Sequence, residues 1–433
     1  MNREALNGMM AWKGAPMRRP LVLRGARQVG KTWAVKEFAA RNYQTLFRLD
    51  FVEEPKFRRI FAGSLNPSSV ISQVEAEFGK RVEPETSLLF LDEVQACANA
   101  LKSLRYFFEE APRYHVIAAG SLLELAMAGT SFPVGSVDYL WMYPMTFSEF
   151  LRGTGSDILA EHLPGLGQTE PLATATHEKL LEMVRLYCAV GGMPQAVEVF
   201  RRTGSLLDVT ATHASLMQSY VDDLNKYRGR LSIDGIDRLL SAIPSQVGRQ
   251  VKYRSVEPEW RIEKTKSVLR LLEQLMLVHP VRSTNCTGLP LGSTASEKVF
   301  KYVFLDVGLV HHQCGGNPAA LLQGGDLLGV HEGRLAEQFV GQELLARGGS
   351  ENRKLYYWDR PERASAAEVD YVVVRDRTIV PVEVKSGPAG RLRSMTQYLR
   401  EHPGTERGVV LSSANVRHEP AYRLAFLPIY TQV

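Results

Sequence analysis

The chain has 433 residues, a length that suits two to four domains. Its hydrophobic content of 45% and charged content of 23% are ordinary for a soluble globular protein. The four cysteines are far apart and form no CxxC pair, which argues against a disulfide framework and a zinc site. No apolar run reaches membrane-spanning length, and the first residues lack the apolar core of a secretory signal. We therefore expect a cytoplasmic protein with no membrane partner.

The positive charge is concentrated in one segment. The formal net charge is +5, and the stretch 226–270 alone holds eleven Lys or Arg against five Asp or Glu. Such clustering favours a nucleic-acid partner, although solvated side chains whose long stems cover apolar surface would give the same composition. The candidate DNA contacts in this segment are Arg249, Lys252, Arg254, Lys264 and Lys266.

The first part of the chain alternates apolar strands with helical patterns. Strand patterns occupy residues 19–24, 43–51, 86–92 and 114–120, and helical patterns occupy residues 30–42 and 101–111. Buried strands that alternate with helices predict a parallel α/β sheet.

The middle of the chain has a different pattern. Residues 152–176 are rich in Gly, Pro and Thr and indicate a loop, and a helical pattern broken at Gly191, Gly192 and Pro194 follows. Apolar residues at helical spacing fill the stretch 261–281, and two strand patterns come next, at 277–283 and 297–306. Helices followed by a two-stranded wing indicate a winged helix.

The segment GARQVGKT, residues 25–32, fits the phosphate-loop pattern G-x-x-x-x-G-K-[ST]. Its glycines let backbone amides turn toward phosphates, Lys31 would reach the β and γ phosphates, and Thr32 would bind Mg²⁺. The helix that follows offers its N-terminus to the same anions. The residues expected to line the nucleotide are Gly25, Ala26, Arg27, Gln28, Val29, Gly30, Lys31 and Thr32.

The second half of the predicted ATP site is the segment LLFLDEVQ. Its apolar residues bury a strand that delivers Asp92, which would hold Mg²⁺ through water, and Glu93, which would polarise the attacking water. Ser121 follows the next buried strand and would either sense the γ-phosphate or cap a helix. We interpret Asp50, at the end of the second strand, as a structural residue.

The tail carries carboxylates and a lysine on two consecutive strand patterns, residues 368–375 and 378–385. Asp370 and Glu383 would share a second divalent metal, and Lys385, two residues beyond Glu383 and on the same face, would orient water or neutralise charge. Glu337 on the preceding helix would complete the metal shell. Short charged patterns also arise by chance, so the order of the four residues is what favours a nuclease-like site.

These motifs together resemble a family of prokaryotic ATPases of the AAA superfamily whose C-terminal region adopts a PD-(D/E)XK nuclease-like fold. The resemblance covers nearly the whole chain and rests on LRGARQVGKT, LFLDEVQ, AAGSLLEL, PVGSVDYLWMYPMTFSEFL, GGMPQAV, YVFLDVGL and EVDYVVV with VPVEVKSG. It implies ATP and Mg²⁺ as cofactors, DNA as a partner, and a homo-oligomer, since ATPases of this superfamily commonly work as rings. The family usually has Arg where this chain has Ser136, which leaves the arginine finger unassigned among Arg27, Arg105 and Arg113.

We therefore expect an α/β multidomain protein in three parts. They are a P-loop AAA-type ATPase domain with a parallel sheet at 1–225, whose helical lid is at about 178–225, a winged-helix domain at 226–320, and a restriction-endonuclease-like α/β domain at 325–433. Three functions stay open: an ATPase that acts on DNA, a nucleotide-dependent signalling switch with a non-catalytic tail, and a metal-dependent nuclease gated by ATP.

Overall fold

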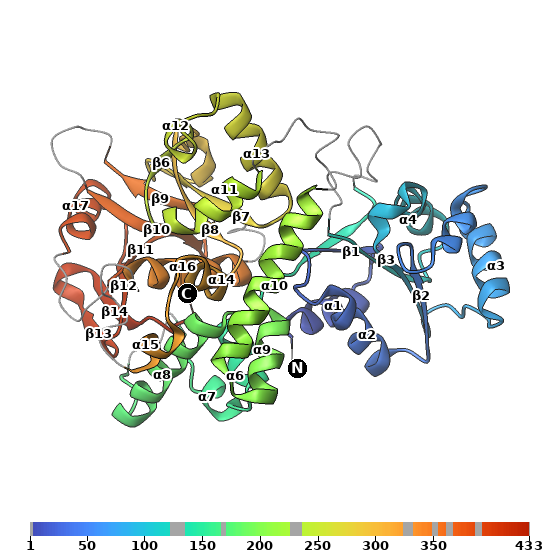
Figure 1. Cartoon of the computed structure of the whole chain (residues 1–433), viewed down its shortest axis with the longest axis horizontal. Coiled ribbons are helices and arrows are strands. Elements are labelled where there is room, and N and C mark those ends of the chain that lie inside the picture. The colour runs from blue at the N-terminus through green and yellow to red at the C-terminus, as the bar shows by residue number, and fades with distance from the viewer. Residues whose placement is uncertain are drawn as a thin grey trace. The chain divides into compact units, whose positions relative to one another are not determined.

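The computed structural model describes residues 3–121, 135–165, 170–225, 236–323, 332–348, 354–360, 367–385 and 392–432. The chain divides into two compact units, Met1–Tyr143 and Pro144–Val433, and each is described by itself (Figure 1). Part of the basic segment, residues 226–235, lies outside the described residues, as does the helical pattern expected directly after Ser121. Among the residues that are described, no helix is long and apolar enough to cross a membrane.

The N-terminal unit is built on a five-stranded parallel sheet. The strand order is β2-β3-β4-β1-β5, and each neighbouring pair is parallel. The strands are β1 (Leu21–Arg24), β2 (Thr45–Asp50), β3 (Ser87–Asp92), β4 (His115–Ala119) and β5 (Asp138–Trp141). The predicted parallel sheet is therefore confirmed, and the carboxyl ends of its strands meet at one edge.

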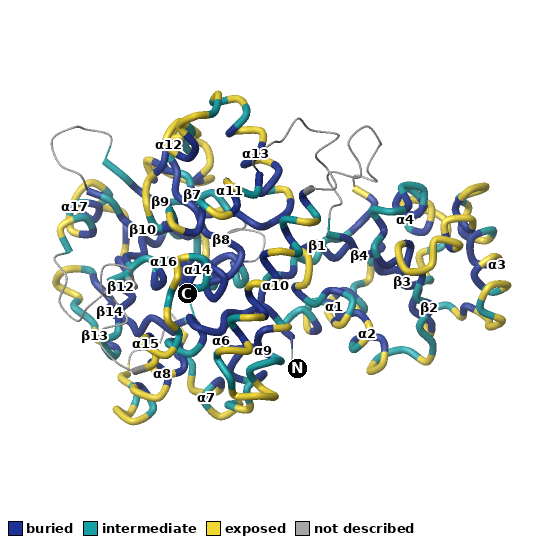
Figure 2. The backbone as a smooth tube through the Cα atoms, in the orientation of Figure 1, coloured by how far each residue is buried: buried dark blue, intermediate teal, exposed yellow. Residues whose placement is uncertain are grey.

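Helices cover this sheet and close its core. They are α1 (Ala5–Lys13), α2 (Lys31–Asn42), α3 (Pro67–Phe78) and α4 (Ala98–Glu110), with the 3₁₀ turns η1 (Pro55–Phe61) and η2 (Val94–Ala96). One core cluster joins sheet residues such as Leu49 and Leu91 to Val74 of α3 and Phe107 of α4. Figure 2 shows the resulting pattern, with buried strands and helices that are exposed on one side.

Strand β5 was not expected from the sequence. It is short and half-buried, and it pairs with β1 along its whole length, from Leu21 opposite Asp138 to Arg24 opposite Trp141. The guanidinium of Arg24 lies 4.5 Å from the ring centroid of Tyr139. The chain just beyond β5 packs against the phosphate loop, since a Cβ atom at Gly25 would collide with the carbonyl oxygen of Met142. Ser136, two residues before β5, is buried.

The C-terminal unit combines a helical region with a second sheet. Its helices are α6 (Phe147–Gly153), α7 (Asp157–Glu161), α8 (Thr174–Val190), α9 (Pro194–Thr203), α10 (Leu206–Asn225), α11 (Ile236–Ala242), α12 (Tyr253–Val256), α13 (Ile262–Gln274), α14 (Val307–Gln313), α15 (Pro318–Gln323), α16 (Glu332–Arg347) and α17 (Arg393–Glu401), with 3₁₀ turns η3 (Ile243–Gln246), η4 (Leu291–Thr294) and η5 (Pro420–Tyr422). Helix α6 begins with a capping box between Thr146 and Glu149, which satisfies amide groups that a first helical turn leaves unpaired. The helical pattern expected around residues 177–200 is present as α8 and α9.

The second sheet is mixed, with nine strands in the order β13-β14-β12-β11-β10-β9-β7-β8-β6. The strands are β6 (Val251–Lys252), β7 (Val278–Ser283), β8 (Val299–Phe304), β9 (Leu355–Asp359), β10 (Glu368–Arg375), β11 (Thr378–Val384), β12 (Gly408–Ser412), β13 (Arg417–Glu419) and β14 (Leu424–Pro428). The α/β fold class is thus confirmed as a parallel sheet in one unit and a mixed sheet in the other.

The strands that we assigned to a winged helix and to the nuclease-like tail belong to this one sheet. Strand β7 pairs with β8 antiparallel on one side and with β9 parallel on the other, with Val281 opposite Leu355. The predicted lid helix α8 also packs in this unit, where its His177 bonds to Tyr430 and to the carbonyl of Ser413. The compact units divide at residue 143, and the three-domain arrangement stays a prediction.

Two of the sequence motifs meet in a buried polar contact of the C-terminal unit. Asp306, ahead of α14, accepts hydrogen bonds from the amides of Gly192, at 2.6 Å, and of Gly308, at 3.0 Å. Gln342 of α16 donates to the hydroxyl of Tyr187 at 2.7 Å and accepts from an amide of α14. Burial raises the pKa of Asp306 to about 6 against the opposing effect of its amide donors. The motifs GGMPQAV and YVFLDVGL therefore have a structural purpose.

Gly191 of this contact has both a backbone conformation and a neighbour that exclude a side chain. Its φ is +75° with ψ near 180°, a conformation that is essentially restricted to glycine, and an added Cβ would collide with the Asp306 carboxylate. We expect Gly191→Ala to lower the free energy of unfolding by about 3–5 kcal/mol in urea unfolding. Gly204→Ala is the matched control, because its φ of +65° is strained but no atom lies near its Cβ, and we expect a loss of about 1 kcal/mol. Equal losses would contradict the steric explanation.

Candidate functional site

The phosphate loop connects β1 to α2 at the carboxyl edge of the parallel sheet. Its backbone takes left-handed conformations at Gln28, with φ of +66°, and at Gly30, with φ of +94°. Gly30 is the N-cap of α2, and the amide of Ala34 begins the helix by donating to its carbonyl at 3.0 Å. The loop therefore places the N-terminus of a twelve-residue helix, with its free amides, at the position where the sequence predicted phosphates.

Lys31 is folded back over this loop. Its ammonium donates to the carbonyl oxygens of Gly25 at 2.9 Å and Ala26 at 2.8 Å, and the residue is 8% exposed. Burial lowers the pKa of Lys31 to about 8, although the nearby charges of Glu93 and Asp92 act in the opposite direction. An ammonium held by two neutral carbonyls in a buried site is poorly neutralised, so the site favours an anion.

Thr32 and Asp92 face each other across the site. The Thr32 hydroxyl donates to one carboxylate oxygen of Asp92 at 3.1 Å. Arg48 on β2 donates from Nε to the other oxygen at 2.9 Å. Burial raises the pKa of Asp92, and the hydrogen bond and charge of Arg48 oppose that rise. A carboxylate and a hydroxyl in contact beside a phosphate loop are ligands that Mg²⁺ accepts.

Arg48 also bonds to Asp50, which lies opposite Asp92 in the pairing of β2 with β3. The Arg48 guanidinium lies 2.5 Å from Asp50, whose other oxygen accepts from the amides of Val52 and Glu53. Asp50 therefore has the structural role expected of it. Arg48 was not predicted as a site residue, although its position two residues before Asp50 on the same strand face was a usable signal.

Glu93 follows Asp92 with a left-handed backbone, at φ of +50°. Such a conformation is uncommon outside glycine, and it turns the side chain away from the line of the strand. The Gln95 amide donates a hydrogen bond to the Glu93 carboxylate. Ser121 lies just beyond β4, which neighbours both β1 and β3 in the sheet. Lys31, Thr32, Asp92, Glu93 and Ser121 thus all follow strands at one edge of the sheet, and the donors and acceptors there fit ATP with Mg²⁺.

The remaining arginine candidates are spread over the surface of the unit. Arg105 pairs with Glu109 at 2.8 Å on α4, and Arg113 pairs with Glu85 at 3.0 Å. Both guanidinium groups are more than 60% exposed, so neither belongs to the phosphate loop.

The C-terminal unit brings the predicted tail residues together. Strands β10 and β11 are antiparallel, and Tyr371 lies opposite Val382, which places Asp370 beside Glu383 at the end of this pairing. The register of β10 against β9 shifts between Val369 and Val372, and such a bulge re-aims the side chains within it. Asp370 accepts a hydrogen bond from the amide of Val384 at 2.8 Å.

A residue that we did not predict, Lys301 on β8, occupies the centre of these carboxylates. Its ammonium lies 2.8 Å from Glu337 of α16 and 3.4 Å from Asp370, and it also pairs with Glu368. The Lys301 side chain is 2% exposed. We call Lys301, Glu337, Glu368 and Asp370 the Lys301 cluster. The signal in the sequence was a single lysine in the otherwise apolar run VFKYVF.

Glu383 and Lys385 form a separate pair beside the Lys301 cluster, with the ammonium 2.5 Å from one carboxylate oxygen. The other oxygen of Glu383 is buried and has no hydrogen-bond partner among the described residues. Burial raises the pKa of both Glu337 and Glu383, and the neighbouring lysines oppose the rise. Across the described residues, no three His, Cys, Asp or Glu side chains are arranged as a metal site. In this arrangement the Lys301 ammonium contacts Glu337 and Asp370, two of the three carboxylates that the sequence predicted as ligands of a second metal.

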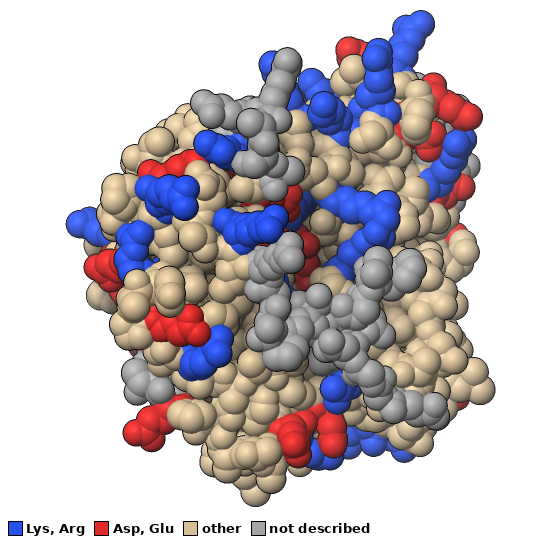
Figure 3. Space-filling model, turned by 90° about the vertical axis from the view of Figure 1, so that its left-hand side faces the viewer, with Lys and Arg blue, Asp and Glu red and all other residues tan. Residues whose placement is uncertain are grey.

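The Lys301 cluster can be reached from solvent. The side chains of Glu368 and Asp370 are 31% and 18% exposed. Figure 3 looks at the C-terminal unit from the left-hand side of Figure 1 and shows acidic atoms in a hollow with Lys and Arg side chains on either side. The Lys and Arg side chains on this face would attract a polyanion, whereas the acidic atoms would repel one.

A second polar surface lies on α13. The helix buries Val268, Leu271 and Leu272, and its opposite side exposes Lys266, Ser267, Arg270 and Gln274, which we call the basic stripe. Arg249, Lys252 and Arg254 are exposed nearby in the sequence, and Lys264 lies 4.2 Å from the ring centroid of Trp260. The five predicted DNA contacts are therefore reachable from solvent in whole or in part.

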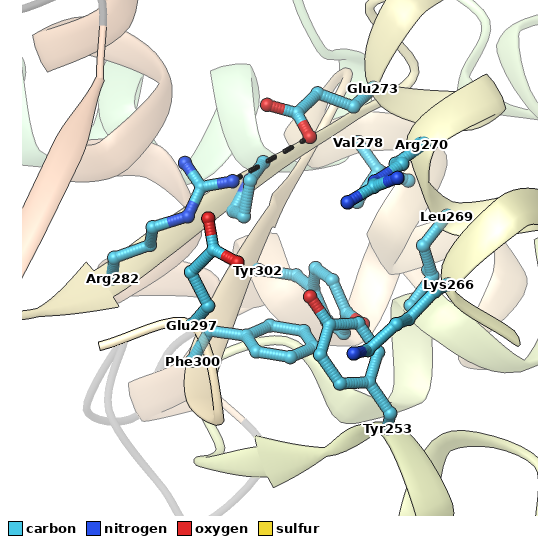
Figure 4. A pocket seen from close by; sticks show the side chains of 11 residues that line it. Tyr253, Lys266, Leu269, Arg270, Glu273, Val278, Arg282, Glu297, Phe300 and Tyr302 are labelled. Carbon is cyan, nitrogen blue, oxygen red and sulfur yellow. Dashed lines mark ion pairs between the residues drawn. The ribbon is translucent and has the colours of Figure 1, made fainter. Parts of the chain in front are cut away.

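A pocket opens beside the basic stripe, with an empty volume of about 530 Å³ that includes open solvent. In Figure 4 its wall carries Lys266, Arg270 and Glu273 from α13, Arg282 from β7, and the rings of Tyr253, Phe300 and Tyr302. Glu273 and Arg282 are 3.9 Å apart. The Tyr302 hydroxyl is buried and lacks a hydrogen-bond partner in the part of the chain that the structure describes.

The chain is similar to several solved structures at low sequence identity and low TM-score. The RuvB Holliday junction branch migration motor of Thermotoga maritima is 14% identical over 64% of this chain and 89% of its own, with a TM-score of 0.30. The Aeropyrum pernix Orc1 protein, solved in complex with DNA, is 13% identical over 74% and 94%, with a TM-score of 0.29. Caenorhabditis elegans PCH-2 is 16% identical over 45% of this chain, which spans 58% of that protein, with a TM-score of 0.26.

No curated protein sequence matches the chain. Family models match three consecutive parts of it. Residues 181–320 and 332–430 match two domains of unknown function, DUF8612 and DUF4143. Residues 17–151 match the AAA domain, and this is the part of the chain that carries the phosphate loop and all five strands of the parallel sheet.

Proposed function

We propose that this protein binds and hydrolyses ATP with Mg²⁺ and uses the cycle to act on DNA. The observation that carries the proposal is the meeting of Lys31, Thr32, Asp92 and Glu93 at the carboxyl edge of the parallel sheet. Phosphates at the loop would give the Lys31 ammonium charged partners in place of two carbonyls. Thr32 and Asp92 would hold Mg²⁺, which supplies charge neutralisation to the phosphates.

Glu93 is the residue assigned to the attacking water. The Glu93 carboxylate would accept the proton of the water, and the hydrogen bond from the Gln95 amide would fix the orientation of this carboxylate. Arg48 keeps Asp92 in place from the side opposite Thr32. Ser121 would contribute a hydroxyl toward the γ-phosphate. We also propose that the protein forms a homo-oligomer, for example a ring. A neighbouring copy would then supply an arginine in place of the one that is missing at Ser136.

The proposed DNA-binding part is the region around α13. A helix that precedes an antiparallel strand pair, with a basic stripe on its exposed side, supports a winged-helix mode of binding. Lys266 and Arg270 would contact phosphates, while Ser267 and Gln274 on the same face offer groups that can reach base edges. The C-terminal nuclease-like domain, with basic side chains around its acidic hollow (Figure 3), would add a binding surface.

The test is ATP turnover with Mg²⁺, with and without duplex and branched DNA, while the DNA is followed on a gel. We expect turnover that DNA stimulates. Turnover that ignores DNA, with the DNA intact, would overturn the DNA part of the proposal and favour a nucleotide-dependent signalling switch whose tail is a non-catalytic interaction module. Absence of turnover would overturn the ATPase part.

The basic stripe gives a quantitative prediction for DNA binding. Each phosphate contact that a protein loses makes the slope of log K against log salt less negative by about 0.9. We therefore expect Lys266→Ala with Arg270→Ala to weaken duplex binding and to change this slope by about 1.8, measured by fluorescence anisotropy of a labelled duplex. Arg201→Ala with Arg202→Ala, which removes two exposed charges from α9, is the control and should leave the slope unchanged. Identical slopes for both double variants would contradict the assignment of α13.

A further inference from the structure

We propose that the Lys301 ammonium is the resident cation of the Lys301 cluster and occupies Glu337 and Asp370, two of the three carboxylates that the sequence predicted as ligands of a divalent metal. The C-terminal site is then complete without metal, and it does not cleave DNA. The nuclease-like arrangement serves to join three parts of the C-terminal unit through one buried cation.

Three carboxylates surround the Lys301 ammonium. The Lys301 ammonium contacts Glu337 from α16 and both Glu368 and Asp370 from β10, so three carboxylates converge on one nitrogen. A divalent metal bound by these residues would need the same oxygens at about 2.0–2.6 Å. It would then lie next to a positive ammonium, which repels it.

Moving Lys301 out of the cluster would require a large free energy. Its backbone is fixed within the sheet, opposite Val281 of β7, and its side chain is 2% exposed. The face of the Tyr357 ring lies 5.4 Å from the ammonium and adds to its stabilisation. A buried ammonium without its carboxylates is strongly unfavourable, so the pairing is the resting state of the site.

The cluster has a structural consequence as well. Strand β8 belongs to the region around the basic stripe, whereas α16 and β10 belong to the tail, and Lys301 ties them together. Gln250, next to β6, adds to this connection by donating to Glu368 at 2.6 Å. The acidic hollow is thereby joined to the proposed DNA-binding region through a lysine and without a metal.

Binding of Mn²⁺ to the nucleotide-free full chain tests the proposal, with free Mn²⁺ measured by electron paramagnetic resonance. We expect the unaltered chain and Asp370→Asn to bind the same number of Mn²⁺ ions, because the cluster takes none. Lys301→Met, which removes the ammonium and keeps the length of the side chain, should gain one ion, and the gain should disappear in the double variant with Asp370→Asn. Lys298→Met, an exposed lysine three residues earlier, is the control and should gain none.

Three outcomes would overturn the proposal. The first is an unaltered chain that binds one more Mn²⁺ than Asp370→Asn. The second is a Lys301→Met variant that is folded by circular dichroism but gains no ion. The third is Mn²⁺-dependent DNA cleavage by the unaltered chain that Asp370→Asn abolishes. If Lys301→Met does not fold, the comparison of the unaltered chain with Asp370→Asn still decides between a lysine and a metal.

Discussion

Lys31→Ala is expected to weaken ATP binding by about 100- to 1000-fold, measured by isothermal titration calorimetry with Mg²⁺ present. The ammonium is buried, donates to the carbonyls of Gly25 and Ala26, and would gain charged partners when phosphates bind. Hydrogen bonds to charged groups contribute about 1.5–3 kcal/mol each, and two near the lower end of this range, about 3–4 kcal/mol together, give a change of this size.

The control for this prediction is Lys36→Ala. Lys36 lies on the same helix, five residues later, and is exposed, so its removal changes the net charge equally without touching the loop. Its ATP affinity should remain within about twofold of the unaltered chain, since isolated surface charges contribute little. Lys31→Ala with unchanged affinity would refute the assignment of the phosphate loop.

The pH dependence of binding in the unaltered chain examines the same ammonium. Because burial lowers the pKa of Lys31 to about 8, the free protein holds this lysine charged below that pH and increasingly neutral above it. Bound phosphates favour the charged form and raise the pKa again. ATP affinity should therefore be level below pH 8 and fall above it, by up to about tenfold per pH unit, with uptake of a proton.

The positions of the candidate site residues at the sheet edge could be predicted because they depend on local segments of the sequence, whereas their role toward a nucleotide stays a prediction. A strand, a loop of fixed length and a helix place Lys31 and Thr32, and a second apolar strand places Asp92. The parallel sheet then brings the two segments to one edge. Arg48 escaped prediction because its role depends on which strand neighbours β3, and that pairing is a long-range choice.

The tail was predictable in the order of its carboxylates but not in its chemistry. Asp370 and Glu383 lie together as their strands imply, and Glu337 approaches from the helix. Lys301 comes from a strand 69 residues before Asp370, in a segment that we had assigned to another domain. Only the pairing of β7 with β9 brings this lysine to the acidic residues, and no local pattern encodes that pairing.

Glu93→Gln is expected to lower kcat for ATP hydrolysis by about 10²- to 10⁴-fold, while ATP affinity changes by less than about threefold. The substitution keeps the size of the side chain and a hydrogen-bonding group for Gln95, but it removes the acceptor for the water's proton. The left-handed backbone at Glu93 places that acceptor beside Asp92 at the sheet edge. Turnover and affinity, measured on the same preparation, separate a role in chemistry from a role in binding.

Glu77→Gln on α3 is the matched control, because it neutralises an exposed carboxylate that forms a surface ion pair with Lys56. It should hydrolyse ATP at the rate of the unaltered chain. If Glu93→Gln lost affinity and turnover in equal measure, Glu93 would hold the nucleotide or its Mg²⁺ rather than the water. If it kept full turnover, another residue at the sheet edge, with Ser121 as the next candidate, would have to orient the water.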